Sequence, residues 1–370
     1  MRPPRVVFVS GNAPPTIDGV GDYTNRLLQH LRPERPEWSW FWLSRRPRWF
    51  SPPLRRRSGI TRLQPGHTWT HRDLMFVRSS LALLKPDILH IQDQIHSFHE
   101  TDAAAQIAKA ARSPVVTTLH EFHVELTSVC HSVDLVHASD HLIANDRRCA
   151  ARCLELTCRE PDHIWWSPSN VPPPDPGWSV QSTPGAVTTF GQINRIRSFY
   201  AVRDALQKLR ARIPSLRWHI VGPFAPQSEP LHAKLAADLN ADWITFTGGT
   251  AQLDDRDFRI ALAQSECMIL PYRDGASPRR TTLQTAWALG IPTITSAPEV
   301  YEPDIVDGTN CVLVKEDTAE AWERALERVL FNDELKRELR EGALSTAERF
   351  SWPKLTRKHL DLYESVLDGR

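Results

Sequence analysis

The sequence has no apolar run that approaches the roughly 18 residues needed to span a bilayer. Near the start only Val6–Val9 is apolar before polar residues return, which predicts a first strand and not a signal peptide. The chain also has no excess of one charge, since 45 Lys and Arg stand against 44 Asp and Glu. Nucleic-acid binders usually carry a marked basic excess, so this balance argues against that class. We therefore expect a cytoplasmic protein.

Cysteine is sparse, and the six that are present form no regular framework. Four of them, Cys130, Cys149, Cys153 and Cys158, share the stretch 120–163 with six histidines. A zinc site is conceivable there, but the stretch has no CxxC pair of the kind that usually binds zinc. Small buried thiols on a helix explain Cys149 and Cys153 equally well, so we expect no metal.

The 370 residues suggest about two domains. Short apolar runs alternate with amphipathic stretches, which predicts parallel sheets wrapped by helices, an α/β fold. Five prolines fall between Pro168 and Pro176, where they oppose both helix and central strand. We expect two doubly wound, Rossmann-like domains, 1–171 and 172–351, facing a central cleft. Ligands in such sheets bind beyond the carboxyl ends of the strands.

Two glycines follow the first expected strand, in the segment Gly19-Val-Gly21-Asp22 before a helix. Glycine lets the backbone approach a ligand, and a helix N-terminus favours an anion such as a diphosphate. A plain strand–helix connection is the alternative, because the segment lacks the GxGxxG fingerprint of dinucleotide binding.

A second candidate for anion binding is the segment Asp274–Thr282. We expect Ser277 to cap a helix whose first turn holds Arg279, Arg280 and Thr281. Two arginines there oppose the helix dipole by roughly 0.3–1 kcal/mol each, which an anion would offset. Solvated arginines that point away from the helix end are the alternative.

Two further strand ends carry polar residues. Arg195 and Arg197 follow the expected strand Ala186–Phe190 and could contact the same phosphates, although a basic surface turn would look the same. His120 and Glu121 follow the strand at Val115–Leu119. There His120 could act as a hydrogen-bonding group or a proton shuttle, or simply be a core histidine.

The order of these motifs resembles family 4 of the retaining glycosyltransferases, from about residue 5 to the end. The resemblance rests on the glycine loop and on six later segments, which are Pro86–Ile91, Thr117–Glu121, Asn170-Val-Pro, Phe190-Gly, His219–Gly222 and Ala286–Pro292. It implies two Rossmann-like domains of the B-type fold. It also implies that the helix at 352–370 crosses back onto the first domain.

The resemblance carries roles to single positions. Gly19 and Gly21 match the loop that approaches the donor diphosphate, and His120 matches a histidine near the transferred sugar. Arg197 stands where the family usually has a phosphate-binding Lys. Gln192 replaces the family's Arg, which weakens the electrostatic clamp on the phosphates unless Arg195 substitutes for that Arg. The resemblance implies a nucleotide-diphosphate sugar as donor, without a further cofactor.

The largest departure concerns two glutamates of the family, which align with Ser277 and Thr285 here. The segment Asp274–Arg280 is similar instead to the Asp-Gly-x-Ser-x-Arg-Arg of one branch. Without the glutamates, a covalent intermediate on Glu is not expected. Retention would proceed by front-face attack, in which the leaving phosphate takes the acceptor proton. Helix amides and arginines then suffice, and a divalent metal is not required.

The acceptor side is less specific. Six arginines with Trp49, Phe50 and Leu54 fill the stretch 45–57, which could contact an anionic membrane or a lipid-linked acceptor, or be a solvated loop. We expect a glycosyltransferase. A non-catalytic scaffold derived from one is the main alternative, and a nucleotide-sugar epimerase the other.

Overall fold

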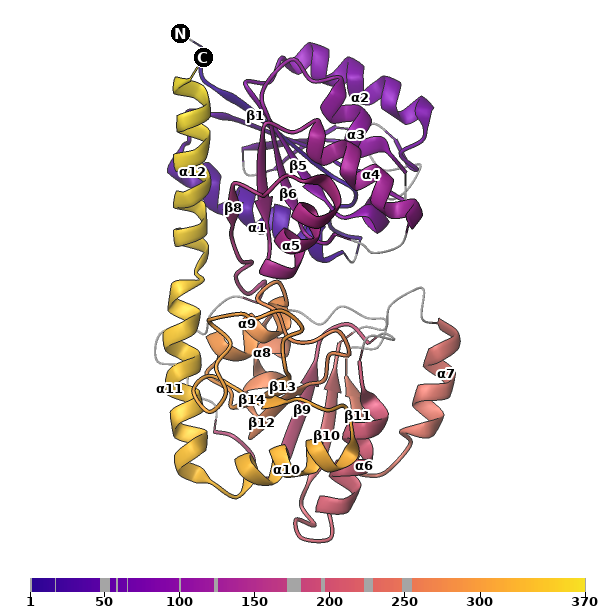
Figure 1. The fold of residues 1–370 in the computed structure, drawn as a ribbon, viewed down its shortest axis with the longest axis vertical. Helices are drawn as coiled ribbons and strands as arrows, with labels where there is room; N and C mark the ends of the chain where they lie inside the picture. Colours follow the sequence, from indigo (N-terminus) through magenta and orange to yellow (C-terminus); the bar gives the residue numbers. More distant parts are fainter. Residues whose placement is uncertain are drawn as a thin grey trace. The chain divides into compact units, whose positions relative to one another are not determined.

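The computed structural model describes residues 2–16, 18–46, 54–57, 59–64, 66–99, 101–122, 126–171, 181–193, 197–222, 229–247 and 255–369. The chain forms two compact units, Met1–Ser167 with Trp352–Arg370 and Pro168–Ser351, which we call the first and second domains (Figure 1). The chain passes from the first to the second domain between Ser167 and Pro168, where the proline-rich stretch begins, and returns to the first domain at Trp352.

The described part of the first domain contains an eight-stranded sheet in the order β3-β4-β2-β1-β5-β6-β7-β8. All neighbours are parallel except β3 and β4. The strands are β1 (Arg5–Ser10), β2 (Ser39–Leu43), β3 (Leu54–Arg57), β4 (Ile60–Leu63), β5 (Ile88–Asp93), β6 (Val115–Leu119), β7 (His141–Ala144) and β8 (His163–Ile164). The helices are α1 (Gly19–Glu34), α2 (His71–Leu84), the 3-10 helix η1 (Ile95–Phe98), α3 (Ala103–Lys109), α4 (Leu126–His137), α5 (Arg147–Thr157) and α12 (Trp352–Asp368).

Alternate side chains of β1 enter two different cores, as the period of two in a strand requires. Val6 and Phe8 pack with α1 and α12, whereas Val7 and Val9 pack with α2 and α3. The central strand is therefore buried on both faces, which explains its continuous apolar run. Helix α12, which lies at the far end of the sequence, covers one of these two faces (Figure 1).

The second domain holds a parallel six-stranded sheet in the order β11-β10-β9-β12-β13-β14. This is the doubly wound strand order 3-2-1-4-5-6, in which the chain adds strands on one side of the first strand and then on its other side. The strands are β9 (Ala186–Phe190), β10 (Arg217–Val221), β11 (Ile244–Thr247), β12 (Cys267–Leu270), β13 (Thr293–Ser296) and β14 (Val312–Val314). The helices are α6 (Phe199–Leu209), α7 (Glu229–Asp238), α8 (Asp255–Ala263), α9 (Thr281–Ala288), α10 (Ala319–Leu330) and α11 (Asp333–Arg349).

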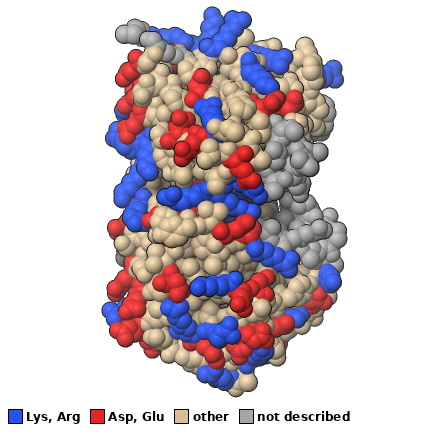
Figure 2. Space-filling view, in the orientation of Figure 1, with Lys and Arg blue, Asp and Glu red and all other residues tan. Residues whose placement is uncertain are grey.

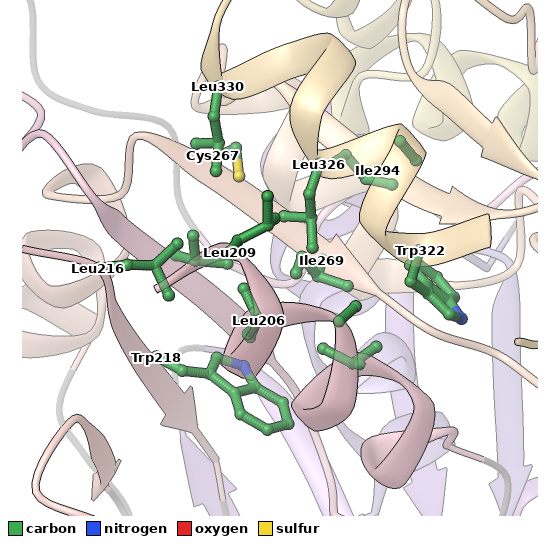
Figure 3. Packing of buried hydrophobic residues seen from close by; sticks show 14 of the residues in the cluster. Leu206, Leu209, Leu216, Trp218, Cys267, Ile269, Ile294, Trp322, Leu326 and Leu330 are labelled. Carbon is green, nitrogen blue, oxygen red and sulfur yellow. The ribbon is translucent and has the colours of Figure 1, made fainter. Parts of the chain in front are cut away.

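Two cores again flank the sheet. On β12, Cys267 and Ile269 face α6 and α10, where Trp218 and Trp322 are fully buried (Figure 3). Met268 and Leu270 of the same strand face α9 and α11. Outside these cores, Lys and Arg are interspersed with Asp and Glu on the visible face of this domain (Figure 2). The expected α/β fold with two doubly wound sheets is confirmed.

Three local expectations are corrected or refined. The segment Gly19–Asp22 does not precede helix α1 but is its first turn, because the Asp18 carboxylate accepts the Gly21 N–H at 2.7 Å and caps the helix. Helix α9 begins at Thr281, with Arg280 at the N-cap position, so Ser277 is not the cap. The basic run at the end of the stretch 45–57 includes a strand, β3.

Candidate functional site

At the carboxyl end of β9 in the second domain, the backbone of Gly191 lies close to the cationic side chain of Arg197. Gly191 has φ of +113°, and a Cβ there would lie 2.5 Å from Thr282 Cγ2 and 2.7 Å from an Arg197 nitrogen. Only glycine allows this approach without displacement. The Arg197 backbone pairs with Tyr272 in a single antiparallel bridge, which ties the turn to the end of β12.

Tyr272 lies between two arginines. The guanidinium carbon of Arg197 is 4.7 Å from the ring centroid, and that of Arg280 is 4.9 Å from it. The Tyr272 hydroxyl bonds the hydroxyl of Thr282, which holds the ring in place. Cation–π contacts of this kind stabilise a cation that has lost its water. The ring therefore positions two positive charges at the start of α9.

Arg197 is 7% exposed, and its Nη1 has no hydrogen-bond partner among the described residues. Burial lowers the pKa of this guanidinium, while Tyr272 and Asp274 oppose the shift. An arginine remains charged at neutral pH despite such a shift. A buried cationic donor without a partner is costly, so this atom is suited to receive an anion.

Asp274 supplies a carboxylate to the other two arginines. Its Oδ2 accepts from Arg279 Nη2 at 3.3 Å and from Arg280 Nη2. The side chains of Arg279 and Arg280 are only 12% and 15% exposed. The alternative of arginines solvated away from the helix is therefore wrong, and so is the expected position of both arginines in the first helical turn. They precede α9, and Asp274 balances their charge.

The remaining expected residues lie around the same helix start. Ser277 is buried, and its Oγ accepts the Arg279 N–H at 3.2 Å within a tight turn. Thr281 opens α9, and its carbonyl accepts from the buried Thr285 hydroxyl at 2.7 Å. Thr285 also bonds Ser169 at 2.7 Å. The two positions that replace glutamates thus have local partners.

Two other residues of the second domain were expected at this site, Gln192 and Arg195. Gln192 is half-buried beyond Gly191. Arg195 falls in 194–196, outside the described residues. The structure thus places Arg197 and Arg280 against Tyr272, which was not singled out from the sequence, and joins Arg279 to Arg280 through Asp274.

In the first domain, the glycine loop is organised by Asp18. Its carboxylate receives the Gly21 N–H, the Asn12 side chain at 3.0 Å and the Ser97 hydroxyl at 2.6 Å. A Cβ on Gly21 would lie 3.0 Å from the Asn12 carbonyl oxygen, whereas one on Gly19 would meet nothing within 4 Å. Gly21 is therefore needed for packing, and Gly19 leaves open space. Asp22 is half-buried in the first turn.

His120 is 7% exposed, at the carboxyl end of β6. Its Nε2 lies 2.8 Å from Gln92 Oε1, and its Nδ1 lies 2.7 Å from Asn145 Nδ2. Since an amide nitrogen donates and an amide oxygen accepts, His120 is the neutral Nε2–H tautomer. Burial lowers its pKa to about 3. This geometry favours a hydrogen-bonding role over a proton shuttle at neutral pH.

Asn145 directly follows β7, contacts His120 and was not singled out from the sequence. It is 3% exposed, and its Oδ1 has no hydrogen-bond partner among the described residues. The only sequence signal was the polar pair Asn145-Asp146 after an apolar strand, in which Asp146 caps α5 through the Cys149 N–H at 2.7 Å. Glu121 is half-buried beside His120.

Two expectations about the first domain concern metal and membrane. Among the residues that the structure describes, no three His, Cys, Asp or Glu side chains come together as ligands for a metal ion. Cys149 and Cys153 are buried on α5. No helix in the described part of the chain has the length and apolar character required to cross a bilayer. Of the stretch 45–57, residues 47–53 lie outside the described residues.

Comparison with known proteins places the second domain close to one family. Residues 185–332 match the family model described as glycosyl transferases group 1. A D-inositol 3-phosphate glycosyltransferase of Nocardioides sp. is 28% identical over 191 residues, which are 48% of this chain and 41% of that protein. The lipopolysaccharide core biosynthesis glycosyltransferase LpsE of Rhizobium meliloti is 26% identical over 181 residues, 48% of this chain and 49% of LpsE. The matches thus span less than half the length of these curated relatives.

Solved structures resemble the whole chain. Sucrose-phosphate synthase from Thermosynechococcus elongatus superposes with a TM-score of 0.80 at 15% identity, covering 99% of this chain and 100% of that one. The Anabaena protein HepE, in complex with UDP and glucose, gives a TM-score of 0.73 at 13% identity, covering 98% and 99%. The fold is the glycosyltransferase B-type fold, with two α/β domains built on parallel sheets.

Proposed function

We propose that the chain is a glycosyltransferase that moves a sugar from a nucleotide-diphosphate sugar to an acceptor. The observation that carries the proposal is the buried cation Arg197, whose Nη1 lacks a partner among the described residues, beside Arg279 and Arg280. A diphosphate would satisfy such a group of guanidinium donors with charge-assisted hydrogen bonds. HepE and a pneumococcal O-GlcNAc transferase, both of which have this type of fold, were solved with UDP.

The three arginines would stabilise the charge that develops on the leaving diphosphate. The bond between the sugar's anomeric carbon and the phosphate oxygen breaks, and a bond from that carbon to the acceptor oxygen forms. The acceptor's proton passes to an oxygen of the departing phosphate. Ser277, which aligns with the family's glutamate near the transferred sugar, offers no carboxylate nucleophile, so we propose retention by front-face attack. Positive charge from arginines makes a divalent metal unnecessary in this scheme.

The first domain would hold the sugar. Asn145 Oδ1, which has no partner among the described residues, is an acceptor for a sugar hydroxyl. Asn145 is fixed by its 2.7 Å contact with His120, so His120 acts as a positioning residue for Asn145. The exposed Gly19, around which a Cβ would find open space, leaves room for a ligand beside α1. Asp18 already caps that helix, so we assign the diphosphate to the second domain.

The acceptor is a glycan, a lipid-linked molecule or a small molecule, and the arginine-rich stretch 45–57 would contact it or an anionic membrane surface. Its last three arginines lie on β3, at the edge of the first domain's sheet. The same domain exposes Met75 (59%), Phe76 (56%) and Leu83 (79%) on α2. Cations and apolar side chains in one domain suit peripheral contact with anionic lipid.

A panel of nucleotides and nucleotide sugars in a thermal-shift assay tests the donor assignment. A ligand at 100 times its Kd should stabilise the protein by about 2.7 kcal/mol. The active nucleotide sugar should then be hydrolysed or transferred by the purified protein. Binding without hydrolysis or transfer would favour the non-catalytic scaffold. The loss of both glutamates is the observation that supports this alternative. Interconversion of two nucleotide sugars would favour the epimerase.

A further inference from the structure

Five buried polar side chains of the first domain form an unbroken hydrogen-bonded chain from β7 to α12. Asn145 Nδ2 lies 2.7 Å from His120 Nδ1, and His120 Nε2 lies 2.8 Å from Gln92 Oε1. Gln92 Nε2 lies 2.9 Å from His90 Nε2, and His90 Nδ1 contacts the hydroxyl of Tyr363. Four of the five are at most 3% exposed, and His120 is 7% exposed.

The order of the chain follows from the fold. His90 and Gln92 are two residues apart on β5, so both side chains lie on the face of the sheet that α12 covers. Tyr363 packs in the same core as β1 and α1, and its ring is 5.8 Å from that of His90. A residue near the end of the sequence is thus joined to His120 through two side chains of one strand.

The Gln92 amide links the two imidazoles by its opposite ends. Its NH₂ group donates to His90 Nε2, which must be bare, and its carbonyl accepts from His120 Nε2, which must carry a hydrogen. His90 then has its hydrogen on Nδ1 and donates to Tyr363. Rotating the amide by half a turn would reverse every bond in the chain. In either arrangement, one of the two histidines carries its proton on Nε2 and the other on Nδ1.

We infer that Gln92 is a positioning residue that couples the tautomer of His120 to that of His90, and thereby selects the polar atom that Asn145 offers to a ligand. In the observed arrangement Asn145 donates to His120 and leaves its carbonyl oxygen for a ligand. In the reversed arrangement its carbonyl would accept from His120 and its NH₂ group would face the ligand. The ligand's identity as a sugar rests on the proposed function, whereas the tautomer coupling does not.

Because both rings are buried, the coupling between them changes which nitrogen carries the proton and does not change the charge of either ring. Burial lowers the pKa of His120 to about 3 and that of His90 well below its usual range, with His359 adding to both shifts. Both rings are therefore neutral near pH 7. Thr118 Oγ1, 2.8 Å from His90 Nε2, and the Tyr363 hydroxyl at His90 Nδ1 both fit either arrangement, because a hydroxyl can donate or accept.

The variant Tyr363→Phe removes the acceptor of the His90 Nδ1 hydrogen. A buried N–H without a partner is rarer in proteins than a buried acceptor without one. The chain should therefore reverse, leaving a bare Nδ1 against the Phe ring and moving the hydrogen of His120 from Nε2 to Nδ1. This change would occur across two intervening side chains, those of His90 and Gln92.

Long-range ¹H–¹⁵N correlation spectra of histidine-labelled full-length protein identify the protonated nitrogen of each ring. We expect Nε2–H on His120 and Nδ1–H on His90 in the wild type, and the exchange of both in Tyr363→Phe. The control Thr356→Val, which removes another buried hydroxyl of α12, should leave both tautomers unchanged. In Gln92→Met, the tautomers of His90 and His120 should no longer be required to differ. Adding Tyr363→Phe to Gln92→Met should then leave the tautomer of His120 unchanged.

Two results would overturn the inference. One is that both wild-type rings carry the proton on the same nitrogen, which needs no variant to observe. The other is that His120 keeps Nε2–H in a folded Tyr363→Phe protein. These spectra need no substrate, so their outcome is separate from the proposed activity. If the activity is present, Tyr363→Phe should raise KM for the donor sugar at least fivefold while leaving affinity for the free nucleoside diphosphate unchanged.

Discussion

The Asp274 carboxylate forms an ion pair with Arg280 immediately before α9. An acidic side chain of the protein itself is therefore paired with an arginine that we propose to bind a diphosphate. Arg279 shares the same carboxylate oxygen at 3.3 Å. A donor phosphate would compete with Asp274 for these guanidinium groups. Without a bound phosphate, Asp274 supplies the negative charge that reduces the repulsion between the two adjacent arginines.

Asp274→Asn should therefore bind nucleoside diphosphate more tightly, by about tenfold, or roughly 1.4 kcal/mol. The apo protein should melt at a lower temperature, because two largely buried arginines lose their counter-charge. Calorimetry and thermal melts measure both effects. Asp307→Asn, which breaks an exposed pair with Arg328 in the same domain, is the matched control. Weaker diphosphate binding in Asp274→Asn would show that Asp274 supports the anion site.

Arg197→Ala, Arg279→Ala and Arg280→Ala should each weaken diphosphate binding by roughly ten- to a hundredfold, since a charge-assisted hydrogen bond contributes about 1.5–3 kcal/mol. Nucleoside without phosphate should bind each variant and the wild type alike. Lys should restore only part of the affinity, because it lacks the planar fork of Arg. Arg328→Ala is the control. Affinities within twofold of the wild type in every single variant and in the triple variant would remove these arginines from the site.

The sequence alone predicted this cluster by its cations but not by its geometry. Strand ends, glycines and arginines are visible in the order of residues, and the alternation of apolar runs predicted both sheets. The contact of Tyr272 with Arg197 and Arg280 depends on a turn from β9 meeting the end of β12, which no local spacing encodes. The start of α9 was misplaced because Pro278 suits a first helical turn, whereas here it belongs to the preceding tight turn.

His120→Ala should lower turnover by on the order of ten- to a thousandfold, since Asn145 loses the ring that orients it. It should also cost about 1–3 kcal/mol of stability, because Gln92 and Asn145 each lose a buried partner. Activity must therefore be assayed well below the melting temperature. A loss of turnover no larger than the loss of folded protein, followed by circular dichroism, would identify a core histidine instead.

Acid should destabilise the first domain through its buried histidines. Burial lowers the pKa of His359 to about 4 and that of His120 to about 3, against roughly 6.5 in an unfolded chain. Because the folded pKa lies below the unfolded one, the unfolded state binds protons first as pH falls. Stability should therefore decrease below pH of about 6.5, by about 1.4 kcal/mol per pH unit for each histidine, until the folded pKa is reached.

Urea denaturation at pH 7, 6 and 5 measures this slope. His359→Gln keeps a donor for the Leu355 carbonyl, which His359 Nδ1 contacts at 2.9 Å, and removes one titrating group. Its slope should be shallower by the share of one histidine. An unchanged slope would mean that His359 is not held neutral in the folded protein.

Binding to anionic vesicles tests the arginine-rich stretch. Replacing Arg45, Arg46, Arg48, Arg55, Arg56 and Arg57 by Ser should abolish co-sedimentation with anionic vesicles, and neutral vesicles should bind neither form. High salt should weaken the wild-type binding, since screening reduces attraction between surface charges. If the Ser variant binds vesicles and turns over the acceptor as the wild type does, the stretch is a solvated surface segment.

Helix α12 also affects the order in which the chain can fold during synthesis. Residues 168–351 form the second domain from one continuous segment, whereas the first domain needs both its opening 167 residues and the helix that follows residue 351. Until the ribosome has delivered α12, the partners of Leu360 and Tyr363, such as Phe8 and Leu27, lack part of their cover. The domain that begins first is thus completed last, and a nascent chain stalled before residue 352 would present an apolar surface to chaperones.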